Sequence, residues 1–388
     1  MKNRKLLMIP GPIEFTPEVL AAVGSPTTSH VAPNFIASFG ESLERLRELF
    51  RSPSGQPFIL AGSGTLAMDS AAANLVEPGD RALVVNTGYF SDRFAGILRR
   101  YGAEVTEVKA RAVGDAPSAD EVARALGARS YKLMTITHVD TSTAVRADVR
   151  SLAALGRNHG ALVVVDGVCS IGGEEFCQDA WGVDLALTAS QKAVGVPPGL
   201  ALIVAGPRAM KAFAARRSAV GSYYSDWTEW LPIMTAYEAR TPAYFGTPAV
   251  NLVWALNVSL GEILSEGMDA RARRHDRLSG AFKAAMAALG LRAVPVRPEL
   301  YASTLTALYY PASTDARLVG LAAEEGVIVA GGLHPEIRTK YFRVGHMGAV
   351  TEADVIATVG AIEKALARSG ASVEPGVGLS AAASALRS

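Results

Sequence analysis

Short apolar runs alternate with amphipathic segments along the first two thirds of the chain. The runs are rich in Val, Ile and Leu without strict polar alternation, which is typical of strands buried on both faces. The predicted strands are Gln56–Ala61, Arg81–Asn86, Glu104–Val108, Leu133–His138, Ala161–Asp166, Leu185–Thr188 and Leu200–Val204. The predicted helices are Thr65–Val76, Asp92–Tyr101, Ala119–Gly127, Val149–His159 and Pro207–Arg217. This order indicates an α/β fold with a mostly parallel sheet covered by helices on both sides.

The pattern changes in the last third of the chain. A long helix is predicted over Ala249–Ser265, and a charged helix follows over residues 271–290. Two β-like runs, at residues 301–311 and 340–346, have helices between and after them. This order is typical of a smaller α+β domain. We therefore divide the chain into an N-terminal arm (1–15), a large α/β domain (16–255), a small C-terminal α+β domain (256–368) and an Ala/Ser/Gly-rich flexible tail (369–388).

Charge and cysteine content narrow the class of protein. The 38 basic residues nearly balance the 37 acidic ones, so no electrostatic signal of a nucleic acid or membrane partner is present. The two cysteines, Cys169 and Cys177, form neither a metal-ligand spacing nor a disulfide framework, which fits a reducing compartment. The apolar run near Met1 is too short for a signal-peptide core, and the ending ALRS differs from the peroxisomal S-K-L signal. We expect a cytoplasmic protein, with a peroxisomal or mitochondrial location left open.

A glycine-rich turn follows the first predicted strand of the large domain. The strand runs into Gly62-Ser63-Gly64-Thr65 and then into an Ala-rich helix, whose free N–H groups would favour a phosphate. A tight turn with Ser63 or Thr65 as helix N-cap explains the same residues. The segment also fits a dinucleotide-binding fingerprint, which requires an acidic residue at the end of the next strand. That strand ends in Asn86, which disfavours a dinucleotide site.

Three further residues are candidates for chemistry. Asp166 ends an apolar strand, where a parallel sheet normally opens onto its ligand, although an Asp-Gly turn is an equally simple explanation. Lys192 lies in SQKAVGVPPG, and a buried lysine amine can attack a carbonyl, whereas a surface lysine has no such role. Arg343 lies in KYFRVGH and could bind a carboxylate or face solvent. When each of these residues is considered alone, a purely structural role is the better explanation.

Taken together in chain order, the four signals are those of one cofactor-binding site: a phosphate cradle, an aspartate, a lysine and an arginine. The lysine would hold an aldehyde cofactor, and the aspartate would keep a pyridine nitrogen protonated. The cradle would bind the cofactor phosphate, and the arginine a substrate carboxylate. This is the pattern of pyridoxal-phosphate catalysis. The spacing from Asp166 to Lys192 is enough for a crossover helix and a return strand.

The sequence resembles the class V, fold-type I aminotransferases, specifically the alanine–glyoxylate / serine–pyruvate group. The resemblance rests on PGP near the start, AGSGTLAMDSA, VDGVCSIGG, SQKAVGVPPG, YFGTPAVN and FRVGHMG, and it covers nearly the whole chain. It implies a mostly parallel seven-stranded sheet domain with a smaller C-terminal α+β domain, and pyridoxal 5'-phosphate as cofactor. It also implies a ping-pong aminotransferase that moves the amino group of alanine or serine to glyoxylate or pyruvate.

The resemblance assigns roles to single residues. Lys192 would be the Schiff-base lysine, Asp166 would bind the pyridine nitrogen, and Arg343 would bind the substrate α-carboxylate. Phe90, rather than its neighbour Tyr89, would stack on the cofactor ring. The implied cofactor-binding residues are Ser63, Gly64, Thr65, Phe90, Thr141, Asp166, Gln191, Lys192, Tyr244 and Thr247, with no metal ligand.

The resemblance also implies that Tyr244 and Thr247 reach the phosphate of the neighbouring subunit. The protein would then be an obligate homodimer with shared active sites. One departure concerns the loop HVDTSTA, where Ala144 stands in place of a glycine found in many relatives.

Other functions stay open on the sequence alone. A 2-aminoethylphosphonate:pyruvate aminotransferase shares much of this scaffold. A cysteine desulfurase is disfavoured, because it needs a thiol on a mobile loop and Cys169 directly follows the Asp166 strand. From other classes, an NAD-dependent dehydrogenase and a non-catalytic binding protein are the remaining alternatives.

Overall fold

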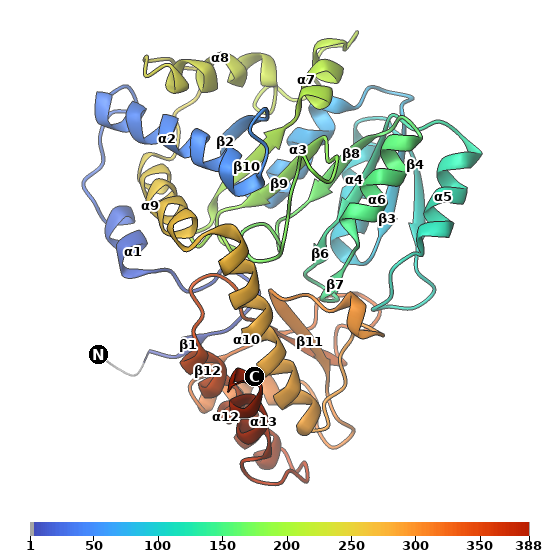
Figure 1. The fold of residues 1–388 in the computed structure, drawn as a ribbon, viewed down its shortest axis with the longest axis vertical. Helices are drawn as coiled ribbons and strands as arrows, with labels where there is room; N and C mark the ends of the chain where they lie inside the picture. Colours follow the sequence, from blue (N-terminus) through green and yellow to red (C-terminus); the bar gives the residue numbers. More distant parts are fainter. Residues whose placement is uncertain (1–3, 388) are drawn as a thin grey trace.

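The computed structural model describes residues 4–387, so residues 1–3 of the arm and Ser388 of the tail lie outside it. A seven-stranded sheet in the order β2-β10-β9-β8-β5-β3-β4 forms the centre of the large domain (Figure 1). The strands are β2 (Gln56–Gly62), β3 (Arg81–Asn86), β4 (Glu104–Lys109), β5 (Leu133–Thr137), β8 (Leu162–Asp166), β9 (Leu185–Ala189) and β10 (Gly199–Ala205). Only β10 runs antiparallel to its neighbours in this sheet. All seven predicted strands are confirmed; six are apolar runs, whereas the edge strand β4 alternates valine with polar residues.

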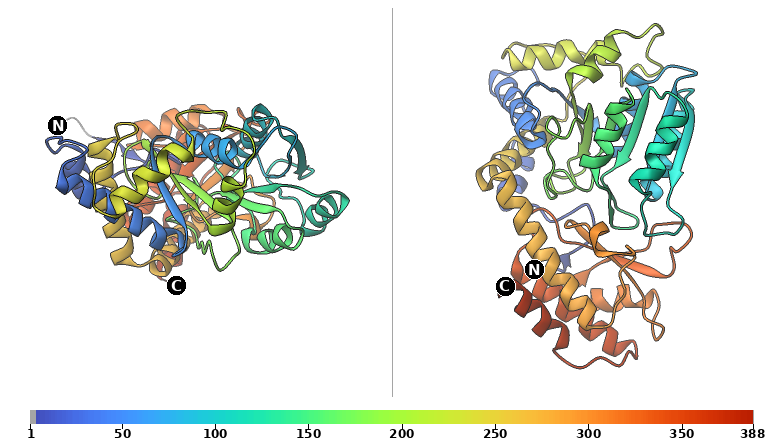
Figure 2. Two further views of the ribbon diagram at one scale, coloured as in Figure 1. Left: turned by 90° about the horizontal axis from the view of Figure 1, so that it is seen from above. Right: turned by 45° about the vertical axis from the view of Figure 1, so that its right-hand side comes forward.

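Helices cover both faces of this sheet (Figure 2). The helices α3 (Gly64–Leu75) and α4 (Tyr89–Arg100) pack on one face, and α5 (Ala119–Ala128) and α6 (Val149–Asn158) pack on the other. Gly156 of α6 lies against Val163 of β8, where a Cβ on the glycine would come within 2.9 Å of the valine side chain. Successive strand side chains point to opposite faces, so Asp166, three residues after Val163, points to the α3 and α4 side.

The remaining helices of the large domain surround the β2 edge and the ends of the strands. They are α1 (Pro17–Val23), α2 (Pro33–Phe50), α7 (Pro207–Ala214), α8 (Trp227–Glu238) and α9 (Val250–Glu266). Of these, α1, α2 and α8 are not predicted from the pattern. The large hydrophobic core runs from Val19 to Ile263, so all of α9 packs with the large domain. We therefore propose that the domain boundary lies at Gly267, after the end of α9, rather than at residues 255/256.

The small domain is built on α10 (Met268–Ala288) and a three-stranded sheet (Figure 1). Its other elements are β11 (Leu305–Tyr309), α11 (Arg317–Glu324), β12 (Val327–Ile328), β13 (Ala330–Gly331), β14 (Tyr341–Gly345), α12 (Glu352–Arg368) and α13 (Val377–Arg387). The arm contributes β1 (Leu6–Leu7), which pairs in parallel with β12. Met8, the next arm residue, is buried in the core of the small domain. The arm therefore connects the two domains.

The prediction of a flexible tail is wrong for Val377–Arg387, which form the helix α13. Ala382 of this helix is fully buried in the core of the small domain, and α13 packs against α10 and α12. The carboxylate of Glu363 accepts hydrogen bonds from the N–H groups of Gly376 and Gly378 at the helix start. The Ala-rich composition misled the prediction, because small residues also allow a helix to pack closely on a neighbour.

Two buried histidines form hydrogen bonds inside the small domain. His275 of α10 accepts a hydrogen bond from the Gly348 N–H at 2.9 Å, and its Nδ1 lies 2.8 Å from the Arg271 carbonyl oxygen. His346 bonds Thr306 Oγ1 at 2.9 Å and the Ser303 carbonyl oxygen at 3.0 Å. Burial lowers the pKa of both histidines to about 3.

Because these histidines are buried in the neutral form, we expect the free energy of unfolding to fall in acid. In the unfolded chain they take up a proton near pH 6.5, whereas in the folded protein they stay neutral down to about pH 3. Their contribution is therefore complete above pH 6.5 and is lost as the pH falls through this window. His346→Asn should reduce the slope of unfolding free energy against pH by about 1.4 kcal/mol per pH unit near pH 5. Denaturant unfolding at several pH values measures this slope, and an unchanged slope would contradict the prediction.

Candidate active site

Lys192 lies buried in the loop between β9 and β10, against the N-terminal arm. Its ammonium group donates a hydrogen bond to the Pro10 carbonyl oxygen. Gly11, at a φ of +107°, makes room for it, since a Cβ there would lie 2.6 Å from Lys192 Nζ. Burial lowers the pKa of Lys192, and the charge of Arg343 lowers it further, whereas Cys169 and Asp166 act in the opposite direction. The amine therefore loses its proton more easily than a surface lysine does.

Asp166 ends β8 and is almost fully buried, with 2% of its surface exposed. Its Oδ1 accepts a hydrogen bond from the Val168 N–H at 3.0 Å, and within residues 4–387 it forms no ion pair. Burial, together with the nearby charge of Asp140, raises the pKa of Asp166 to about 7. A buried carboxylate is costly without a positive partner, so this position suits a cationic ligand atom such as a protonated ring nitrogen.

The N-terminus of α3 lies beside the turn that follows Asp166. A Cβ on Gly64 would come within 2.7 Å of the Val168 side chain, so glycine allows this close approach. Ser63 is the N-cap residue, and its side chain does not bond the N–H groups of the helix. Thr65 is exposed, and its Oγ1 accepts a hydrogen bond from Arg93 at 2.8 Å. Free N–H groups, a free hydroxyl and the helix dipole favour a phosphate here.

Gln191 supplies a further polar group next to Lys192. Its Oε1 is buried and has no hydrogen-bond partner in the part of the chain that the structure describes. Buried polar atoms are normally hydrogen-bonded, so an unused one is expected where a ligand completes a site. This observation fits the predicted position of Gln191 beside a cofactor.

Arg343 of β14 reaches from the small domain to the loop that carries Thr141. Its Nη1 donates to the Thr141 carbonyl oxygen at 3.2 Å, and its Nε donates to the Gly331 carbonyl oxygen at 3.0 Å. Burial lowers the pKa of Arg343, yet a guanidinium group remains charged in proteins. A half-buried positive charge near Lys192 suits a substrate carboxylate.

Phe90 lies in the first turn of α4, on the sheet face toward which Asp166 points. The guanidinium carbon of Arg93 lies 4.8 Å from the centre of the Phe90 ring and 5.2 Å from that of Tyr89. Arg93 also bonds Thr65, so it links the predicted ring-stacking residue to the phosphate cradle. The sequence prediction missed Arg93, although its spacing of three residues from Phe90 places both on one helix face.

Tyr244 and Thr247 lie on the exposed segment between α8 and α9. Tyr244 is 64% exposed, and its ring centre lies 5.1 Å from that of His30. Among the described residues, neither forms a hydrogen bond or ring contact with the site around Lys192. The predicted contact of these two residues with the cofactor phosphate is therefore not made within one chain.

The loop between the short strands β6 (Val139–Asp140) and β7 (Val145–Arg146) keeps its turn without the usual glycine. Ala144 adopts a φ of +60°, in the left-handed region that favours glycine. Its carbonyl oxygen accepts a hydrogen bond from the Ala302 N–H at 3.3 Å, and its methyl group is buried. Alanine therefore occupies a backbone conformation that favours glycine in this loop.

The chain matches the family model described as "Aminotransferase class-V" over residues 13–355. The chain belongs to the class-V aminotransferases. It is 42% identical to alanine–glyoxylate aminotransferase 1 of Saccharomyces cerevisiae over 360 residues, which are 89% of this chain and 93% of that protein. It is 34% identical to the L-aspartate–glyoxylate aminotransferase of Paracoccus denitrificans, over 98% of this chain and 96% of that protein.

Solved structures agree with this assignment. The ureidoglycine–glyoxylate aminotransferase of Bacillus subtilis superposes with a TM-score of 0.93 at 27% identity, covering 100% of this chain and 99% of that one. The protein is therefore a fold-type I aminotransferase that uses pyridoxal phosphate. The buried Asp166, the open N-terminus of α3 and the unpartnered Gln191 amide fit this cofactor.

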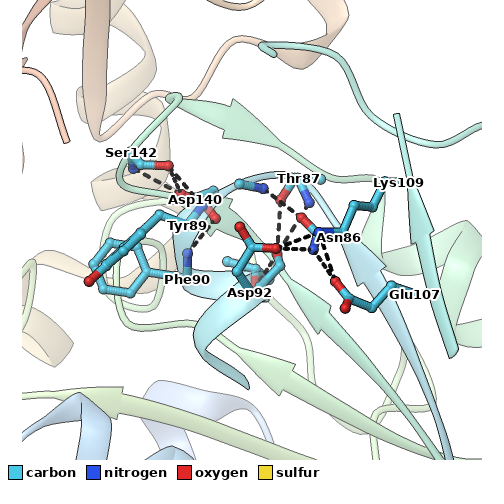
Figure 3. A network of polar contacts seen from close by, with 12 residues as sticks. Asn86, Thr87, Tyr89, Phe90, Asp92, Glu107, Lys109, Asp140 and Ser142 are labelled. Carbon is cyan, nitrogen blue, oxygen red and sulfur yellow. Dashed lines mark hydrogen bonds and ion pairs between the residues drawn. The ribbon is translucent and has the colours of Figure 1, made fainter. Parts of the chain in front are cut away.

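The family assignment confirms the prediction of an aminotransferase. It disfavours the two alternatives from other classes, an NAD-dependent dehydrogenase and a non-catalytic binding protein. Asn86, the residue that counted against a dinucleotide site, donates hydrogen bonds to Asp92 at 2.8 Å and Glu107 at 2.7 Å (Figure 3). Between residues 4 and 387, the structure contains no helix with the length and apolarity needed to cross a membrane.

Proposed function

We propose that this aminotransferase moves the amino group of alanine or serine to glyoxylate, or to pyruvate, in a ping-pong reaction. The observation that carries the proposal is the convergence of Lys192, Asp166 and Arg343 from two domains on one buried site. The names of the yeast and Paracoccus relatives support glyoxylate as acceptor.

In this proposal the residues divide the work between binding and proton transfer. The cofactor supplies a protonated ring that accepts electrons from the substrate. Asp166 would keep the proton on the ring nitrogen, while the N-terminus of α3 and Gln191 would bind the phosphate. Thr141 would bond the ring hydroxyl, and Phe90 would stack on the ring. Lys192 Nζ would hold the cofactor aldehyde, and once a substrate amine has displaced it, the free amine would carry the α-proton, first as a base and then as an acid.

A substrate matrix tests this function. The purified holoenzyme is incubated with alanine, serine, aspartate or 2-aminoethylphosphonate, each against glyoxylate and pyruvate, and the new amino acid is quantified. We expect the highest kcat/KM for alanine or serine with glyoxylate. A preference for 2-aminoethylphosphonate would favour the alternative aminotransferase, and no transfer with any pair would refute the proposal.

Replacing Arg343 should weaken carboxylate binding. Arg343→Gln removes the charged hydrogen bonds from the guanidinium group to the substrate carboxylate, so KM for the amino acid should rise by roughly 10- to 100-fold. The cofactor should still bind, because Arg343 reaches the site from the small domain. Arg317→Gln is the matched control, since this arginine lies in the same domain with a side chain that is 75% exposed. A KM equal to that of the unchanged enzyme would contradict the carboxylate role.

We also propose that the enzyme is a homodimer whose partner contributes to each site. Large exposed hydrophobic side chains gather on two segments, with Leu20 and Val31 on one and Tyr223, Tyr224 and Tyr244 on the other. The ring contact between His30 and Tyr244 joins these two segments. An apolar surface of this kind is typical of an interface.

The unpaired cysteines support our further proposal of a cytoplasmic location.

Mixed dimers test the shared site. Lys192→Ala and the double variant Tyr244→Ala/Thr247→Ala should each be nearly inactive. Unfolded and refolded together, they should recover about a quarter of the normal specific activity, because half of the dimers then carry one complete site. Specific activity and size-exclusion mass measure the result. No recovery in mixed dimers, or a fully active monomer, would contradict sharing.

A further inference from the structure

The first turn of α4 has no cap from its own residues. Its N-cap residue is Gly88, and no side chain of this segment bonds the first N–H groups. The Phe90 N–H instead donates to Asp140 Oδ2 at 3.1 Å, and the Tyr89 N–H donates to Ser142 Oγ at 3.1 Å (Figure 3). The cap therefore comes from the end of β6 and the loop that follows it, some fifty residues later in the chain.

Asp140 and Ser142 form one rigid unit. Asp140 Oδ1 accepts hydrogen bonds from the Ser142 N–H at 2.9 Å and from the Ser142 hydroxyl at 2.6 Å. The approach to α4 is close, since a Cβ on Gly88 would lie 2.7 Å from Ser142 Oγ and 2.8 Å from Asp140 Cγ. Asp140 is fully buried, and burial raises the pKa of its carboxyl, whereas the hydrogen bonds from Ser142 and Phe90 lower it. All these contacts use its oxygens as acceptors, as expected for a carboxylate at the positive end of a helix.

The same loop carries contacts to the rest of the site. Thr141, predicted to bond the cofactor hydroxyl, lies between the two capping residues, and its carbonyl oxygen accepts from Arg343. The hydroxyl of Tyr341 donates to the Ser142 carbonyl oxygen. Thr143 Oγ1 donates to the Thr87 carbonyl oxygen at 3.1 Å, just before α4. One turn thus connects the residues predicted to stack on the ring, bond its hydroxyl and bind the substrate.

We propose that Asp140 is a positioning residue, which fixes Phe90 and Thr141 relative to each other around the cofactor ring. The inference rests on the proposed roles of Phe90 and Thr141. It goes beyond them because Asp140 itself is not proposed to touch cofactor or substrate. Its charge also acts on Asp166, whose pKa it raises. Losing the carboxylate should let the start of α4 and the loop move independently.

The helix itself should survive this loss. Asp92, also in the first turns of α4, accepts hydrogen bonds from Asn86 at 2.8 Å and from Lys109 at 2.7 Å (Figure 3). This second anchor ties α4 to β3 and to the end of β4 without using Asp140. A substitution at position 140 is therefore expected to loosen the site rather than unfold the domain.

Asp140→Ala tests the proposal. After reconstitution with pyridoxal phosphate, its cofactor dissociation constant should rise about tenfold, and kcat should fall by about 10- to 100-fold. The visible circular dichroism band of the bound cofactor should weaken, because the ring is held less rigidly. Ser142→Ala, which keeps the carboxylate, should change all three quantities in the same direction by smaller amounts, and it decides the outcome if Asp140→Ala does not fold.

Asp148→Ala is the matched control, since Asp148 accepts a hydrogen bond from the Ser151 N–H in the first turn of α6 at 3.1 Å. It should lower Tm without changing cofactor affinity or the visible band. The proposal is overturned if the position-140 and position-142 variants change cofactor affinity and the band no more than Asp148→Ala does. A reconstituted wild-type enzyme that shows the visible band but transfers no amino group from alanine or serine would instead refute the proposed function.

Discussion

Lys192→Ala is expected to reduce transamination by about 10⁴-fold or more while the protein remains folded. The variant loses both the amine that attaches the cofactor and the group that carries the α-proton. Its side chain lies in a loop against Pro10 and Gly11, so removing it leaves the sheet and both cores intact. Steady-state kinetics measure the loss, and far-ultraviolet circular dichroism checks the fold.

Lys283→Met is the matched control for this substitution. Lys283 is a half-buried lysine, and burial lowers its pKa to about 8, but it bonds Ser279 and Ala302 inside the small domain. This variant should lose stability and keep its activity. Borohydride treatment followed by peptide mapping adds a second measurement, since the cofactor should be fixed at Lys192. Attachment elsewhere, or near-normal activity of Lys192→Ala, would contradict the assignment.

Asp166→Asn is expected to lower kcat by at least about a hundredfold. An amide has nearly the same shape, so the bond from the Val168 N–H can persist. The amide cannot hold a proton on the ring nitrogen, because it carries no charge. The loss should therefore appear mainly in kcat, with a smaller change in KM for the amino acid.

Asp184→Asn serves as the control for a buried carboxylate outside the site. Asp184 accepts a hydrogen bond from the Val163 N–H at 2.9 Å and pairs with Arg208, at the opposite end of β8 from Asp166. Its substitution should lower Tm with little effect on kcat. Equal kcat losses in the two variants would mean that Asp166 acts only through the fold.

The sequence pattern predicts the sheet well and the caps poorly. Apart from the more polar edge strand β4, each strand of the central sheet is an apolar run, and these runs are visible without any tertiary information. The start of α4 is predicted at Asp92 but lies at Tyr89, because its cap comes from Asp140 and Ser142, far away in the chain. Long-range contacts of this kind leave no local signal.

The same distinction holds for the site. Lys192, Asp166 and Arg343 could be proposed because each ends or interrupts an apolar run, and together they match one cofactor. Asp140 stands next to Thr141 in HVDTSTA, yet nothing local shows that its carboxylate faces another helix. The contact of Pro10 with Lys192 also depends on the arm crossing between domains, which the pattern of the first residues does not reveal.

The pairing of β1 with β12 has a consequence for the order of events during synthesis. The partners of Leu6 and Leu7, Val327 and Ile328, are translated more than three hundred residues after them. If this pairing positions the arm, the Pro10 carbonyl oxygen can accept its hydrogen bond from Lys192 only after most of the polypeptide has emerged. Because such distant pairing is slow, nascent chains should acquire vitamin B6 late, after translation is nearly complete.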